Sequence, residues 1–135
     1  MNNSKEKKMP PREINVTIQG NDYVVKFPNT GQLIDIETMK VRISGDTQKS
    51  LLYSSTPQGQ QAYISIETIA TFSVLCKDLM NDLNIDLFDL SPMELKPFMK
   101  AYTEKIHPWF QEWYSVINEV EPDVKDDKES NNTME

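Results

Sequence analysis

Half of the aromatic residues of this chain lie in one stretch, Leu90 to Asn118, which covers less than a quarter of its length. The stretch also contains the only histidine, His107. Because only 38% of the 135 residues are hydrophobic, these large side chains must supply much of the surface that folding can bury. We therefore expect the fold to be organised around this stretch. Its aromatic residues are Phe98, Tyr102, Trp109, Phe110, Trp113 and Tyr114.

Two helices are predicted within this stretch. Ser91 and Glu94 have the spacing of a capping box, and Pro92 occupies the first helical position, where a missing N–H is tolerated. Pro97 implies either a distorted first turn or a regular helix that begins there. Pro108 disfavours helical geometry at the residue before it, so we expect a break or a kink at that point. The apolar faces comprise Leu95, Phe98, Met99, Tyr102 and Ile106 in the first helix and Trp109, Trp113, Val116 and Ile117 in the second.

A β-hairpin is predicted near the N-terminus. Apolar residues alternate with polar ones on both sides of Gly20-Asn21, a pair that is typical of a two-residue turn. A turn at these residues places the apolar side chains of both strands on one face, and Pro28 then ends the second strand. Because a lone hairpin is marginal in water, the helices must cover this face. The expected cross-strand pairs are Ile14 with Phe27, Val16 with Val25 and Ile18 with Tyr23.

The segment Gln32 to Ser44 fits two patterns. Its apolar residues form a helical stripe, whereas residues 37–43 could also alternate as a strand. We favour a helix, because Asn29-Thr30 resembles a helix start and Gly45 is well placed to end one.

The middle of the chain is predicted to pass from loop to helix. The segment Asp46 to Gln61 is rich in loop-forming residues, with room for one helical turn at Gln48 to Tyr53. Ser65 is predicted to cap a helix that runs to Leu83, and its wide apolar stripe indicates a central position. Asn84 to Leu90 is then a short connector with four apolar residues that we expect in the core. The stripe comprises Ile66, Ile69, Phe72, Val74, Leu75, Cys76, Leu79, Met80 and Leu83, and the connector contributes Ile85, Leu87, Phe88 and Leu90.

Charge and composition divide the chain into one domain and two tails. Residues 1–12 have four basic residues and one acid, net +3, and residues 119–135 have seven acids and two lysines, net −5. Neither segment has an apolar pattern, so we expect a disordered basic tail and a disordered acidic tail around a single domain at residues 13–118. That domain has thirteen acids and eight bases. This acidic balance argues against nucleic-acid binding.

The sequence also bears on the compartment in which the chain is made. The N-terminal lysines are followed by no apolar run, and no segment approaches the length of a membrane span, so we expect neither a signal peptide nor a membrane anchor. Cys76 is the only cysteine, which excludes an intrachain disulfide and favours intracellular synthesis.

Three features could carry chemistry, and for each we favour a structural interpretation. Cys76 lies on the apolar stripe without a neighbouring base, as a small buried hydrophobic residue does. His107 has no second histidine or cysteine beside it, so a structural or surface role is favoured over catalysis or metal binding. The acidic run Asp82–Asp89 begins like a calcium loop, but Leu87 replaces the required glycine and Met93 the required glutamate. We therefore predict no catalytic residue, cofactor or metal ion.

The tryptophan cluster has two interpretations. As core, Trp109 and Trp113 would pack on the hairpin face through Phe27 and Tyr23, which we favour for a domain with few other large side chains. As an interface, the cluster would be an exposed anchor for a protein partner, and part of the aromatic surface is expected to remain exposed in either case. The candidate partner-binding residues are Trp109, Phe110, Trp113, Tyr114 and Ile117.

The order of these parts is similar to that of a known family. A short hairpin with the sequence INVTIQGNDYVVKF, followed by several helices and a charged C-terminus, resembles the small tail assembly chaperones of long-tailed bacteriophages. The resemblance covers residues 13–118 in organisation and assigns no individual site residue. It implies a non-enzymatic protein that self-associates and coats the tape measure protein during tail assembly.

Taken together, the sequence predicts an α+β domain, with an N-terminal β-hairpin packed against a mostly helical bundle of three to five helices. The expected partners are a phage structural protein and further copies of the chain, with no nucleic acid and no membrane, in the host cytoplasm or the virion. Two alternatives remain open: a head or tail accessory protein that stays in the particle, and an acidic regulator that binds a host protein through the C-terminal tail.

Overall fold

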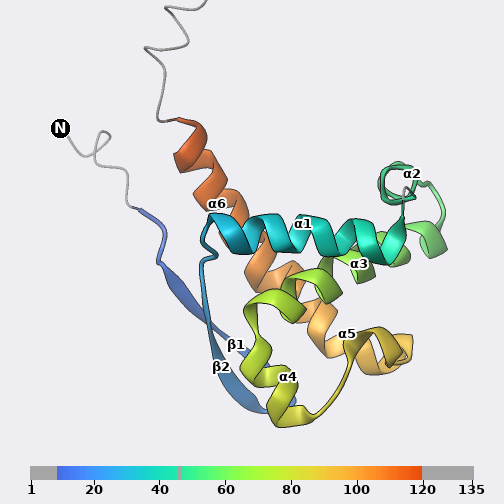
Figure 1. Cartoon of the computed structure of the whole chain (residues 1–135), viewed down its shortest axis with the longest axis horizontal. Helices are drawn as coiled ribbons and strands as arrows, with labels where there is room; N and C mark the ends of the chain where they lie inside the picture. The colour runs from blue at the N-terminus through green and yellow to red at the C-terminus, as the bar shows by residue number, and fades with distance from the viewer. Residues whose placement is uncertain (1–8, 46, 120–135) are drawn as a thin grey trace, which may run out of the picture.

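A computed structural model describes residues 9–45 and 47–119 of the chain. Its fold is an N-terminal antiparallel hairpin followed by helices, which confirms the predicted α+β class (Figure 1). Most of the two predicted tails, residues 1–12 and 119–135, lies outside the described residues. The elements are β1 (Glu13–Ile18), β2 (Asn21–Lys26), α1 (Thr30–Ser44), α2 (Gln48–Leu52), α3 (Pro57–Leu75), α4 (Lys77–Leu83), a 3-10 turn (Leu87–Asp89), α5 (Pro92–Ala101), a π-helical turn (Tyr102–Ile106) and α6 (His107–Asn118).

The predicted hairpin is present, but its register is wrong by two residues. The turn consists of Gln19 and Gly20, both at positive φ, so Ile18 pairs with Asn21. Glycine at the second turn position adopts this conformation without strain, which favours the observed turn over the expected Gly20-Asn21. The apolar face survives, because a shift of two residues leaves every side chain on the same side of the sheet. Ile14 now faces Val25, Val16 faces Tyr23, and Phe27 lies beyond the end of β2.

Helix α1 has the boundaries that its flanking residues predicted. The Asn29 side chain accepts from the Gln32 N–H at 2.8 Å, and the Gln32 side chain accepts from the Asn29 N–H at 3.0 Å. This capping box fixes the start, and Gly45 at a φ of 63° ends the helix. The strand alternative for residues 37–43 is therefore wrong, and the expected helical turn after Gly45 is α2.

The long helix predicted at Ser65 to Leu83 is wrong at its start and in its continuity. Helix α3 begins at Pro57, where the Thr56 hydroxyl accepts from the Gly59 N–H at 3.0 Å. A proline at the first position and a threonine cap are favourable in a helix start, although the same residues resemble a loop in sequence. The chain then leaves helical geometry at Cys76 and resumes as α4.

The connector after α4 buries only part of its apolar side chains. Leu87 is fully buried, whereas Ile85 and Leu90 are partly buried against the core. Phe88 is exposed, so its predicted place in the core is wrong. In the 3-10 turn Leu87–Asp89 neighbouring side chains point to different sides, so Leu87 faces the core and Phe88 faces solvent.

The last helices form one continuous helical stretch. The predicted capping box is present, with the Ser91 hydroxyl accepting from the Glu94 N–H at 3.2 Å. Pro97 is accommodated inside α5. The break expected before Pro108 is absent, because a π-helical turn ends there and the His107 N–H donates to the Tyr102 carbonyl. With this stretch counted once, the described residues hold five helical stretches, within the predicted three to five.

The core lies where α3 meets the hairpin and the α5–α6 stretch. Helices α1 and α3 pack together, and the α5–α6 stretch passes behind α1 in the view of Figure 1. Phe72 of α3 and Phe98 of α5 meet edge to face, with ring centres 5.6 Å apart. Among the described residues, none of the helices has both the length and the apolar character that a membrane crossing requires. The most deeply buried apolar residues include Val16, Ile18, Val25, Phe72, Leu79, Leu87, Phe98 and Ile106.

Candidate protein-binding groove and a buried charged cluster

Phe27 is the centre of an aromatic cluster that joins the hairpin to α6. Its ring centre lies 5.5 Å from that of Trp109, 5.3 Å from that of Phe110 and 5.2 Å from that of Trp113. Tyr114 is more distant, at 6.4 Å. These are the separations at which aromatic pairs add stability beyond the area that they bury. The expected packing of α6 through Phe27 is therefore confirmed, whereas Tyr23, the other residue expected there, forms no ring contact with either tryptophan among the described residues.

Both indole groups share one backbone acceptor. The N–H groups of Trp109 and Trp113 donate to the Pro11 carbonyl at 2.7 and 2.9 Å. The Arg12 guanidinium lies 5.8 Å from the centre of the Trp113 ring, as in a cation–π contact. Pro11 and Arg12, which the sequence assigned to the basic tail, thus contact α6. With only 3% and 8% of their surfaces exposed, the two tryptophans belong to the core.

Burial divides the five candidate partner-binding residues. The two tryptophans and Phe110 are at most 8% exposed, so nearly all of their surface is buried within the domain and only the edge of Trp113 lines the groove. Tyr114 and Ile117 are 38% and 48% exposed. Ile117 lines a cavity of about 430 Å³, which we call the α6 groove. The groove is lined by Arg12, Glu13, Lys26, Phe27, Pro28, Asn29, Trp113 and Ile117.

A second cluster, missed in the sequence, consists of charged and polar side chains from α1, α2, α3 and the π-helical turn around a buried ion pair. The Lys40 ammonium lies 3.0 Å from the Glu67 carboxylate and 2.8 Å from that of Glu37. Tyr102 donates its hydroxyl to Glu67 at 2.9 Å, and the Gln48 amide donates to the other carboxylate oxygen at 3.0 Å. The side chains of Lys40 and Glu67 are only 12% and 11% exposed. We call these five residues the Glu67 cluster.

The Glu67 cluster is satisfied by its own partners. Among the described residues, no buried side-chain nitrogen or oxygen lacks a hydrogen-bond partner. The adjoining cavity of about 240 Å³ is lined by Tyr63, Tyr102 and His107 besides the charged residues. A buried carboxylate with an ammonium and two further donors is typical of a structural network, because each charge is neutralised within the protein.

The sequence did contain a signal for this cluster. Glu67 interrupts the most apolar run of α3, Ile66 to Phe72, where an unpaired carboxylate would be costly. Lys40 likewise falls on the apolar stripe of α1. Two opposite charges on two apolar stripes indicate a buried pair, but only the packing of α1 on α3 shows that they meet.

Among the described residues, five groups have a raised pKa and so bind their protons more tightly than usual: Cys76, Tyr102, Lys40, Tyr63 and Tyr114. Burial raises the pKa of the Cys76 thiol from 9.0 to about 12. Burial, and then the Glu67 carboxylate, raises the pKa of Tyr102 above its ordinary value of 10.0. Burial alone would lower the pKa of Lys40, but the carboxylates of Glu37 and Glu67 outweigh this effect and raise it above 10.5. The contribution of such groups to the free energy of unfolding is lost as the pH rises past their ordinary pKa values, because the unfolded chain then releases protons that the folded chain still holds.

We expect the free energy of unfolding to be level near neutral pH and to fall from about pH 9 upward, where the unfolded chain begins to lose these protons. Urea titrations followed by circular dichroism at several pH values measure this fall. Tyr102→Phe removes one of these groups, so the stability of this variant should decline less steeply with pH even though it starts from a lower value. Stability that stays level to about pH 11 would contradict the assignment.

The other residues considered in the sequence take ordinary structural positions. Cys76 is buried at the junction of α3 and α4, in agreement with the structural interpretation. His107 is exposed, and its ring centre lies 5.8 Å from that of Tyr102. In the acidic run, the Asp86 carboxylate accepts from the Phe88 N–H at 3.0 Å and so caps the 3-10 turn. Within residues 9–45 and 47–119, no three His, Cys, Asp or Glu side chains are grouped so that they could hold a metal ion.

Comparisons with protein-family models, with curated proteins and with solved structures found no match for this chain. The function is therefore inferred from its residues and their geometry. The α6 groove contains the exposed Ile117, whereas the charged groups of the Glu67 cluster are engaged with one another.

Proposed function

We propose that this protein is a non-enzymatic assembly protein that binds a phage structural protein, such as the tape measure protein, and associates with copies of itself. The observation that carries the proposal is the exposed end of the apolar stripe of α6. The stripe buries Trp109 and Trp113 against Phe27, and one turn beyond Trp113 it leaves Ile117 48% exposed in the α6 groove. An exposed apolar patch next to a rigid aromatic anchor is typical of protein-binding surfaces.

The lining of the α6 groove suggests the chemistry of the partner. Phe27, Pro28 and Ile117 provide an apolar floor, whereas Arg12 and Lys26 place two positive charges at the rim against one carboxylate. A helix with an apolar stripe and acidic flanking residues fits such a groove, as amphipathic helices do in other proteins. The resemblance stated above makes a tape measure protein the expected partner. Such proteins are long and helical, which agrees with a helix as the occupant of this groove.

Binding is favoured over catalysis by the state of the groups that could react. The Cys76 thiol is buried and its pKa is about 12, so the nucleophilic thiolate is suppressed at neutral pH. Glu67 and Lys40 are the most deeply buried charges, and each is engaged by the other. A general acid or base must instead reach a substrate, so these residues support a structural role.

Replacing Ile117 by lysine tests the proposal. The side chain is exposed and lies in the last turn of α6, where a positive charge is tolerated, so the fold should be retained. We expect a tagged wild-type chain to recover a structural protein of the phage from producing cells and Ile117→Lys to recover at least about tenfold less. The matched control is Val41→Lys, because Val41 is a similarly exposed apolar residue on α1, outside the groove. Circular dichroism shows whether both variants remain folded.

The outcome separates the proposal from its alternatives. Equal recovery by Ile117→Lys and wild type would contradict the assignment of the α6 groove. Recovery of a host protein instead, and its loss on deletion of residues 121–135, would favour the regulator. Mass spectrometry of purified particles distinguishes a chaperone, which is absent from them, from an accessory protein, which is present.

A further inference from the structure

In the described part of the chain, the outer edge of β2 pairs with no other strand. The Phe27 N–H donates to the Arg12 carbonyl at 2.8 Å, which makes these two residues a hydrogen-bonded pair. Such pairs alternate with non-hydrogen-bonded ones in an antiparallel ladder. By this alternation, Asp22, Val24 and Lys26 direct their backbone N–H and C=O groups away from β1. Within the described residues the sheet has these two strands alone, so the edge is open to a third.

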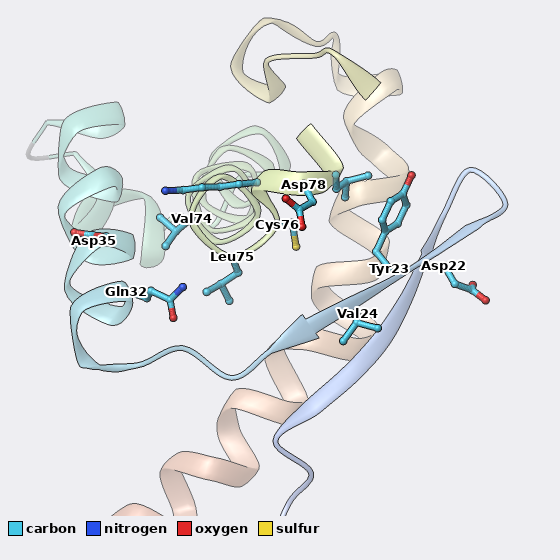
Figure 2. Close-up of a pocket in the computed structure, with 11 residues that line it drawn as sticks. Asp22, Tyr23, Val24, Gln32, Asp35, Val74, Leu75, Cys76 and Asp78 are labelled. Carbon is cyan, nitrogen blue, oxygen red and sulfur yellow. The ribbon is translucent and has the colours of Figure 1, made fainter. Parts of the chain in front are cut away.

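This open edge borders a hollow rather than a flat surface. Figure 2 shows the hollow between β2, α1 and the junction of α3 and α4. Its volume is about 450 Å³, and Val24 at the strand edge is 57% exposed. We call it the β2 groove. It is lined by Asp22, Tyr23, Val24, Gln32, Asp35, Val74, Leu75, Cys76, Lys77, Asp78 and Leu79.

The charge of the β2 groove is negative. Three acidic residues, Asp22, Asp35 and Asp78, and one basic residue, Lys77, line it, with the Asp22 side chain directed away from the hollow in Figure 2. Asp22 accepts from the Thr17 hydroxyl at 2.6 Å. Among the described residues, neither Asp35 nor Asp78 has a hydrogen bond or an ion pair through its carboxylate. An extended segment with basic side chains would satisfy both the strand edge and these charges.

We propose that the β2 groove binds the basic N-terminal segment of a second copy of this chain, which adds a third strand to the hairpin. Residues 1–8 carry Lys5, Lys7 and Lys8 against a single acid, in a chain whose net charge is −7. Extended, these residues reach about 26 Å, enough to follow the six residues of β2. The inference rests on the self-association included in the proposed function and names the segment and the surface that produce it.

The N-terminal segment of a second copy can reach the β2 groove more easily than the N-terminal segment of the same molecule can. The described chain starts at Met9 beside α6, and Pro11 is held by the two tryptophans at the open end of the hairpin. The β2 groove instead borders Asp22 and Val24, towards the turn. A segment of the same molecule would have to fold back along the hairpin, whereas the segment of a neighbouring copy can enter from either end.

Charge reversal tests the proposal on the full-length chain. Sedimentation velocity over a range of concentrations should show oligomers for the wild type. Lys5→Glu/Lys7→Glu/Lys8→Glu should weaken self-association by at least about tenfold. The groove variant Asp22→Lys/Asp35→Lys/Asp78→Lys should have a similar effect, and an equimolar mixture of the two variants should associate again. The matched control for the change in net charge is Lys96→Glu/Lys100→Glu/Lys105→Glu, which reverses three exposed lysines outside the groove.

A proline in the strand edge tests the pairing itself. Val24→Pro removes an N–H that points away from β1, so it should block a third strand and leave the hairpin intact. Asn15→Pro makes the matching change at the outer edge of β1, since Asn15 lies opposite Val24. We expect only Val24→Pro to dissociate the oligomer, with both variants shown to be folded by circular dichroism.

These experiments test the β2 groove independently of the proposed function. A wild type that stays monomeric up to about 0.1 mM overturns it, as does an oligomer that survives the Lys5, Lys7 and Lys8 reversals. Equal dissociation by Asn15→Pro also overturns it. Monomeric variants that still recover the phage partner would leave the α6 groove assignment intact, because the two surfaces are tested by different residues.

Discussion

Replacing Trp109 by alanine is expected to lower the free energy of unfolding by about 3 to 5 kcal/mol, as other large-to-small changes in cores do. The substitution removes a ring that contacts Phe27 and an indole N–H that donates to the Pro11 carbonyl at 2.7 Å. A cavity would remain where the hairpin, α6 and residues 11–12 meet. Urea denaturation followed by circular dichroism measures the loss.

Two further variants show which property of Trp109 matters. Trp109→Phe keeps most of the volume and loses the hydrogen bond, so we expect a smaller loss of about 1 to 2 kcal/mol. Tyr114→Ala, in the same helix, should cost less than Trp109→Ala, because Tyr114 is 38% exposed whereas Trp109 is 3% exposed. If Trp109→Ala cost no more than Tyr114→Ala, the tryptophan would not belong to the core.

Replacing Glu67 by alanine should also destabilise the protein by about 3 to 5 kcal/mol, because it leaves a buried ammonium without its closest buried partner. Lys40 would keep only the exposed carboxylate of Glu37, and the Tyr102 hydroxyl would lose its acceptor. Glu67→Gln retains an acceptor for Tyr102, so its effect should be smaller. The measurement is again the free energy of unfolding in urea.

A double-mutant cycle provides the control for the Glu67 cluster. Lys40→Met and Glu67→Leu each leave one charge buried, whereas the double variant replaces both charges by apolar groups of similar size. Removal of both partners of a buried ion pair is often close to neutral. We therefore expect the double variant to be more stable than Glu67→Leu alone. Additive effects of the two substitutions would show that the ion pair contributes no coupling.

The hairpin shows how far a local pattern determines structure. Alternation from Ile14 to Phe27 correctly predicted the strands and their apolar face, because side-chain direction repeats every two residues. The register depends instead on which two residues form the turn. Glutamine rarely adopts a positive φ, so the sequence favoured a turn at Gly20-Asn21 over the observed turn at Gln19-Gly20.

Helix ends were predicted where a cap could be recognised from its side chains. Asn29, Ser91 and Gly45 fulfilled their expected roles, since each acts through neighbouring backbone groups. Thr56 acts in the same way, but Pro57 and the residues after it resemble a loop, so the first part of α3 was missed. Capping residues therefore predicted helix ends except where the residues around them resemble a loop.

The functional surface depended on tertiary structure. The sequence indicated that Trp109, Trp113, Tyr114 and Ile117 share one segment, but only the packing of Phe27 decides which of them are buried. The Glu67 cluster likewise joins side chains from four elements, α1, α2, α3 and the π-helical turn. Sequence periodicity identifies apolar faces, whereas the partner of each face is set by the whole fold.

The central claim is that the exposed side of α6 contacts a structural protein of the phage. Its most direct test is a photo-crosslinking amino acid placed at Ile117 in cells that produce the protein, with Val41 as the matched control position. We predict a covalent adduct with a long helical structural protein from Ile117 and none from Val41. No adduct from Ile117, or the same adduct from both positions, would contradict the claim.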